Sequence, residues 1–258
     1  MYKFKMIPGL FLISILGLSG CGPSTTESDQ QTESSHNPDI IQYGSMREAI
    51  GDQQDQGRVR FAELVKQPHC YAVAALEGLK GEAAIVDGEL TVSIVDDQGQ
   101  LKSVVEDADQ LQATMLAGSY VNQWHDIAVE QDVAAEEFDK FLAESAEASG
   151  VSTDKPFLFT VEGDFSDLHL HVINGACPVH ARMQQQVLPA EVKPFEQAMP
   201  KISGTLVGIY ARDAVGKLTQ PATETHRHFV YEDDSNQKQV GHVEKGGILK
   251  GATLRIAN

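Results

Sequence analysis

The chain is poor in cysteine, in basic residues and in long apolar runs. Its 258 residues include 3 Cys, and 20 Lys and Arg stand against 37 Asp and Glu. Three thiols exclude a disulfide-rich scaffold and a zinc site with four cysteine ligands. The formal net charge of -17 repels phosphate backbones, so we expect no nucleic-acid partner. The apolar run at 6–18 is shorter than the roughly twenty residues of a transmembrane helix.

The N-terminal segment has the pattern of a secretory signal peptide. Two lysines precede the apolar run, as in the charged start of such signals. Leu18, Ser19 and Gly20 then precede Cys21, and this pattern resembles a bacterial lipobox, whose cysteine is lipidated after cleavage. A plain signal peptide with an incidental cysteine is the alternative. We expect residues 1–20 to be removed, and Cys21 to anchor the protein by lipid in the cell envelope, on the outer membrane or on a membrane facing the periplasm.

Residues 21–40 are predicted to be the lipidated cysteine and a flexible linker. The stretch 23–39 has no large apolar residue and is rich in Ser, Thr, Gln and acidic residues, so it cannot bury a core. Two thiols remain beyond it, Cys70 and Cys177. They are free to pair in an oxidising envelope, but the sequence does not place them within bonding distance, so their pairing stays open.

The rest of the chain is patterned as an α+β protein. Hydrophobic residues make up 41% of the sequence and charged residues 22%, which suits a folded core. Apolar runs between 71 and 95 predict strands, and Asp87-Gly88 between two of them predicts a tight hairpin. Near-helical spacing of apolar residues predicts an amphipathic helix within 126–149. The polar stretch 183–201 contains three Pro and predicts a long loop or crossover. Short β-rich runs dominate the C-terminal half, at 157–161, 168–173, 205–210, 226–231 and 240–243.

His226 and His228 are the sharpest local feature. On a strand, residues i and i+2 point to the same side, so both imidazoles face one space. A hairpin centred near Ser235 places His242 opposite His228. Three imidazoles that converge from two strands predict a metal site with positions left open, and zinc, copper, nickel and iron all accept such ligands. Three half-exposed histidines on a hairpin are the alternative.

A rival pair with the same spacing is present at His169 and His171, with His180 nearby. We rank this pair lower because no hairpin places its third ligand.

Five motifs resemble, in the same order, those of the α-acetolactate decarboxylases. The resemblance covers roughly residues 41–250, and the combination is specific although each motif alone is weak. The motifs are Tyr43–Met46 (YGSM), Gly78–Glu82 followed by Val86–Gly88 (GLKGE…VDG), Gly204–Gly208 (GTLVG), His226–Phe229 (HRHF) and Gly241–Val243 (GHV).

The resemblance implies a zinc site and two catalytic residues. The family's zinc ligands fall on His226, His228 and His242, and its glutamate near the metal falls on Glu82. Its arginine, from a strand before the GTLVG motif, falls on Arg182. Loss of carbon dioxide from a β-keto acid leaves negative charge on the ketone oxygen, which a metal stabilises as a Lewis acid. Arg182 is expected to hold the carboxylate, and Glu82 to deliver the proton to carbon or to hold a water molecule.

The implied fold has two parts. A mixed α/β sheet domain over residues 41–155 packs on an antiparallel β-barrel domain over residues 156–258, which carries the metal site. The implied reaction converts 2-acetolactate, a small 2-hydroxy-3-keto acid, to acetoin and carbon dioxide. A homodimer is considered, although the sequence does not set the oligomeric state. Ala75 stands where the family usually has Thr. A non-catalytic metal- or ligand-binding lipoprotein of the same fold is therefore the alternative.

Overall fold

The computed structural model describes residues 37–258, which fold mostly as β-strands. The predicted signal peptide, Cys21 and the linker up to residue 36 lie outside the described residues. The described residues belong to one compact unit. None of the helices in this part of the chain combines the length and the apolar character of a membrane span.

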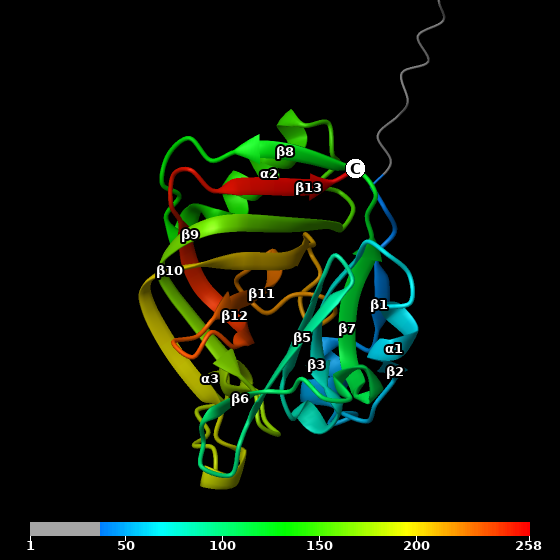
Figure 1. Ribbon diagram of the computed structural model, residues 1–258, viewed down its shortest axis with the longest axis vertical. Helices are drawn as coiled ribbons and strands as arrows, with labels where there is room; N and C mark the ends of the chain where they lie inside the picture. Colours follow the sequence, from blue (N-terminus) through cyan, green and yellow to red (C-terminus); the bar gives the residue numbers. More distant parts are fainter. Residues whose placement is uncertain (1–36) are drawn as a thin grey trace, which may run out of the picture. The chain divides into compact units, whose positions relative to one another are not determined.

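The first antiparallel sheet uses the N-terminal strands, drawn from blue to green in Figure 1. Its order is β1-β7-β3-β4-β5-β6, and β2 pairs with β7. The predicted hairpin is confirmed, because Val86 pairs with Glu89 across a two-residue turn. Asp87 and Gly88 in this turn both have positive φ, as a tight hairpin requires. The strands are β1 (Ile41–Tyr43), β2 (Val59–Arg60), β3 (Cys70–Leu76), β4 (Glu82–Val86), β5 (Glu89–Val95), β6 (Leu101–Ser103) and β7 (Gln112–Tyr120).

The second antiparallel sheet has the order β10-β11-β12-β9-β13-β8, and β9 also pairs with β10. β9 is one continuous strand where the sequence predicted two. The loop predicted at 183–201 ends at Phe195, because residues 195–199 pair with residues 168–172 of β9. The strands are β8 (Trp124–Ala128), β9 (Phe157–Val172), β10 (Phe195–Tyr210), β11 (Thr225–Glu232), β12 (Lys238–Ile248) and β13 (Thr253–Ala257).

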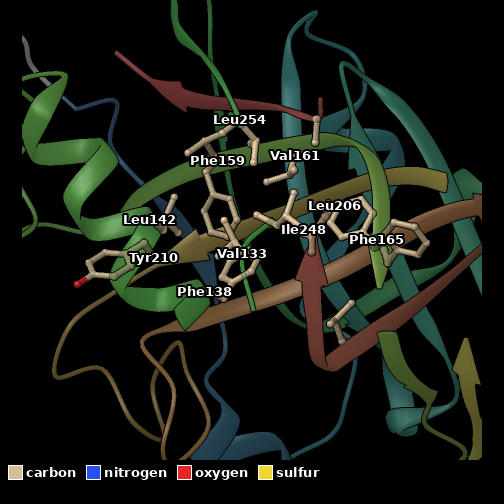
Figure 2. Packing of buried hydrophobic residues seen from close by; sticks show 14 of the residues in the cluster. Val133, Phe138, Leu142, Phe159, Val161, Phe165, Leu206, Tyr210, Ile248 and Leu254 are labelled. Carbon is tan, nitrogen blue, oxygen red and sulfur yellow. The ribbon is translucent and has the colours of Figure 1, made fainter. Parts of the chain in front are cut away.

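The longest helix in the described chain, α2 (Phe138–Ala148), covers one part of the second sheet's core. Phe138 and Leu142 belong to the same apolar cluster as Phe159 and Tyr210 (Figure 2). The predicted amphipathic helix is confirmed only in its C-terminal half, because residues 124–128 pair with β13 instead. The other helical segments are short: η1 (Arg47–Gly51), α1 (Phe61–Leu64), η2 (Glu77–Leu79), η3 (Ala108–Gln110), η4 (Ala135–Glu137), α3 (Pro178–Met183) and η5 (Ala190–Val192).

The two sheets pack against each other through a shared apolar layer. Tyr71 and Val73 of β3 lie in one cluster with Val207 and Ile209 of β10 and Val240 of β12. The alternate residues of β3 belong to a different cluster that includes side chains of α1, as the two-residue period of a strand requires. This packing brings β4 of the first sheet against the strands that carry the histidines.

A mixed α/β part and an antiparallel β-barrel were expected, and two antiparallel sheets are observed. The first sheet is more purely β than the mixed α/β domain predicted, because all its strand pairs are antiparallel and need no helical crossovers. Closure of the second sheet into a barrel and the domain boundary at residue 155 stay predictions. Cys70 and Cys177 are both buried and are not bonded to each other.

Candidate metal centre

Four histidines line up on three neighbouring strands of the second sheet. His226 and His228 are two residues apart in β11, so their side chains leave the strand on the same side. His228 pairs with His242 of β12, as the predicted hairpin centred near Ser235 requires. His242 pairs in turn with His171 of β9. The strand register therefore places His228, His242 and His171 in one row.

His226, His228 and His242, the histidine triad, form the tightest group. Their candidate ligand atoms lie within 4.8 Å of one another, and their ring centroids are 5.1 to 5.4 Å apart. All three side chains are buried. Burial lowers the pKa of His226 to about 4 and the pKa values of His228 and His242 well below the ordinary range, with neighbouring imidazoles adding to the effect. The triad is therefore neutral, which is the form that binds metals.

The orientation of His228 leaves one nitrogen for a metal. Nδ1 lies 2.9 Å from the carbonyl oxygen of Ala83 and donates a hydrogen bond to it. Nε2 is buried and has no hydrogen-bond partner within residues 37–258. Such a nitrogen is costly to bury, and metal ligation satisfies it. A carbonyl on the other ring nitrogen is the usual support for a ligating imidazole. The triad therefore fits zinc or another divalent transition metal.

Glu82 reaches the triad from the first sheet. Its Oε2 lies 3.5 Å from Nε2 of His228, and the residue is only 3% exposed. Burial raises the pKa of Glu82 well above its ordinary value, against a weaker opposing effect from a backbone hydrogen bond at Ile173. Burial therefore favours the protonated carboxyl at this contact with the His228 imidazole. Gly81 makes it possible, because its φ is +149° and a Cβ there would lie 2.5 Å from the carbonyl oxygen of Ser93.

His171 is connected to Arg182 through a carboxylate. Its Nδ1 lies 2.8 Å from Oε1 of Glu244, and Arg182 donates hydrogen bonds to Glu244 and to Glu196. Partial burial acts to raise the pKa of Glu244, but hydrogen bonds and charge from His171 and Arg182 lower it to about 2. The Arg182 side chain is 49% exposed. Its guanidinium group pairs with two carboxylates at the edge of the site.

A small cavity adjoins the triad. Its volume is about 20 Å³, which is room for about one water molecule. A second cavity of about 220 Å³ shares four lining residues with it, namely Met46, Ile50, Cys177 and Gln220. The small cavity is lined by polar side chains from both sheets among mostly apolar neighbours, including Glu82, His171, His226, His242, Ala75, Met115 and Ile173.

The structure brings the triad and Glu82 together, whereas Arg182 lies outside the cavity. β9, the strand before the GTLVG motif, contains no arginine and contributes His171 to the cavity. Its H-x-H spacing marked His171 as a rival ligand, but the structure places it beside the triad. His169 and His180 do not line the cavity. The sequence interpretation assigned no role to Glu244, whose only local signal is its position two residues after His242.

Comparisons with known proteins show what this fold is similar to. The alpha-acetolactate decarboxylase from Bacillus subtilis strain 168 is 17% identical, with a TM-score of 0.61 over 84% of each chain. The acetolactate decarboxylase from Bacillus subtilis subspecies spizizenii is 16% identical, with a TM-score of 0.59 over 84% of this chain and 85% of that one. A Staphylococcus aureus protein of unknown function, described as similar to alpha-acetolactate decarboxylase, is 16% identical, with a TM-score of 0.60 over 85% of each chain.

At these identities the three structures show a shared fold. A search of curated proteins found no match. The profile of the alpha-acetolactate decarboxylase family matches residues 40–258, which include both sheets and every residue of the candidate centre. The chain therefore belongs to the alpha-acetolactate decarboxylase family.

Proposed function

We propose that the protein decarboxylates 2-acetolactate to acetoin and carbon dioxide with a divalent metal, zinc in the first instance, on the histidine triad. One observation is the main support for the proposal. A buried carboxyl, that of Glu82, lies 3.5 Å from Nε2 of His228 and lines the same cavity as His226 and His242. A protonated acid beside neutral metal ligands is the pairing that decarboxylation followed by protonation needs.

The residues divide the reaction between them. The triad nitrogens hold the ion, which when bound supplies a Lewis acid for the negative charge that develops on the ketone oxygen. Burial raises the pKa of Glu82 and so favours the protonated carboxyl, whose proton can pass to the carbon that loses carbon dioxide. Apolar neighbours such as Met115 and Ile173 leave room for only about one water molecule in the cavity, and this environment strengthens these electrostatic effects. The carboxylate of the substrate leaves as carbon dioxide, and its bonding electrons stay with the carbon and the ketone oxygen.

Acetoin release from racemic 2-acetolactate by the purified protein tests the proposal. The chelator-treated protein is the control, and activity is expected to disappear with the metal and to return on addition of zinc. A protein that holds stoichiometric zinc and releases no acetoin above the spontaneous rate would refute the enzymatic function.

A non-catalytic metal- or ligand-binding relative is the second candidate. It is favoured by the position of Arg182, which pairs with Glu196 and Glu244 and does not line the cavity. Zinc binding without turnover is the result that distinguishes this candidate from the enzyme.

We also propose that a lipid on Cys21 anchors the protein in the cell envelope. The support is the signal-like segment at 1–20 that ends at this cysteine. These residues lie outside the described part of the chain.

A further inference from the structure

We infer that His171 selects hydroxyl-bearing substrates, by a hydrogen bond between its Nε2 and the substrate hydroxyl beside the histidine triad. The inference deepens the proposed function and rests on it for the substrate class, a 2-hydroxy acid. His171 is the residue that β9 contributes to the cavity, and the inference gives it a role in substrate binding.

The ring of His171 is held in one orientation. It is 1% exposed, and its Nδ1 lies 2.8 Å from Oε1 of Glu244. Arg182 holds the same carboxylate oxygen from α3 and also holds Glu196, so Glu244 is itself fixed. A carboxylate behind a ring nitrogen is the arrangement that orients imidazoles in catalytic sites.

This anchoring leaves Nε2 as the nitrogen available to the cavity. The ring lines the cavity with Glu82, and its centroid lies 4.8 Å from that of the His242 ring. β9, which carries His171, is the neighbour of β12, which carries His242. A substrate group bound at the triad therefore lies beside the His171 ring. No other step of the proposed reaction involves Nε2 of His171.

A single imidazole nitrogen suits a hydroxyl better than a carboxylate. A hydroxyl both donates and accepts, so it bonds to Nε2 whether or not that nitrogen carries hydrogen. A carboxylate is best held by two parallel N–H donors from arginine, and the fork of Arg182 is already taken by Glu196 and Glu244. His171 therefore distinguishes 2-hydroxy acids from acids that carry a methyl group in place of the hydroxyl.

Two unreactive ligands isolate this contact. 2-Hydroxyisobutyrate and pivalate share the carboxylate and differ by hydroxyl against methyl at one carbon. Calorimetric titration of the zinc-loaded full-length protein gives the ratio of their dissociation constants. We expect wild type to prefer 2-hydroxyisobutyrate, and His171→Leu to lower that preference by about tenfold, the value of one hydrogen bond in a buried site. His169→Leu, the same change on the same strand outside the cavity, is the matched control and should leave the ratio unchanged.

Two further variants keep the test valid even if His171→Leu does not fold. Glu244→Ala retains the imidazole but removes its anchor, and should lower the preference as well. His171→Gln retains a donor and an acceptor, and should keep more of the preference than leucine does. An unchanged ratio in both His171→Leu and Glu244→Ala overturns the inference, as does an equal loss of both ligands, which would mean that His171 holds the carboxylate. Binding of neither ligand by wild type also overturns it. A normal hydroxyl preference without acetoin release refutes the proposed function alone.

Discussion

Replacement of Glu82 by glutamine separates the acid–base role of this residue from its structural one. Glutamine keeps the shape of the side chain and cannot transfer a proton at neutral pH. General acid–base catalysis is typically worth about a hundred- to ten-thousand-fold in rate. We therefore expect Glu82→Gln to reduce acetoin production by about that factor, which corresponds to a barrier increase of roughly 3 to 5 kcal/mol. Zinc content should stay stoichiometric, because the three triad nitrogens are untouched.

The same substitution should stabilise the metal-free protein at neutral pH. The carboxyl is 3% exposed, and burial raises the pKa of Glu82 well above its ordinary value of 4.5. In the unfolded chain this group ionises near pH 4.5, whereas in the folded protein it stays protonated to higher pH. The contribution of Glu82 to stability is therefore fully retained below pH 4.5 and is lost as pH rises toward its folded pKa. The amide of the glutamine side chain does not ionise, so Glu82→Gln does not lose this stability as pH rises.

Thermal unfolding of chelator-treated wild type and Glu82→Gln at pH 5 and pH 8 measures this difference. The advantage of the variant should be larger at pH 8. An advantage that does not grow with pH would mean that Glu82 is not a buried acid. Near-normal acetoin production by zinc-loaded Glu82→Gln would exclude Glu82 as the proton donor, whatever its pKa.

Three other perturbations test the metal centre and the anchor. His228→Ala should lose most of its bound zinc by elemental analysis, whereas His171→Ala should retain it, and the reverse pattern would move the metal to the β9 histidines. Burial lowers the pKa of His226 from 6.5 to about 4, so metal-free protein should lose stability as pH falls from about 6.5 toward 4, by roughly 3 kcal/mol from this group. Urea unfolding of metal-free Glu82→Gln, which lacks the opposing contribution of the Glu82 carboxyl, that is equal at pH 7 and pH 4.5 would contradict that burial. Cys21→Ser should leave the membrane fraction or stay unprocessed, and normal processing with membrane retention would eliminate the lipid anchor.

Local patterns were sufficient to predict the histidine triad. The period of two places His226 and His228 on one side of any strand, and hairpin symmetry about Ser235 fixes His242 opposite His228. Both relations depend only on neighbours within one hairpin. The tight turn at Asp87-Gly88 was predictable for the same reason, because its backbone conformation is set by the two residues in the turn.

Contacts between distant segments were decided by the tertiary structure. His171 joins the triad only because β9 pairs with β12, which follows it by more than sixty residues in the chain. The same pairing brings Glu244 between His171 and Arg182, so Arg182 pairs with carboxylates outside the cavity, and its catalytic role stays a prediction. Glu82 meets His228 through the packing of one sheet on the other. Strand register and sheet packing depend on the burial of many side chains at once, so no local residue pattern specifies them.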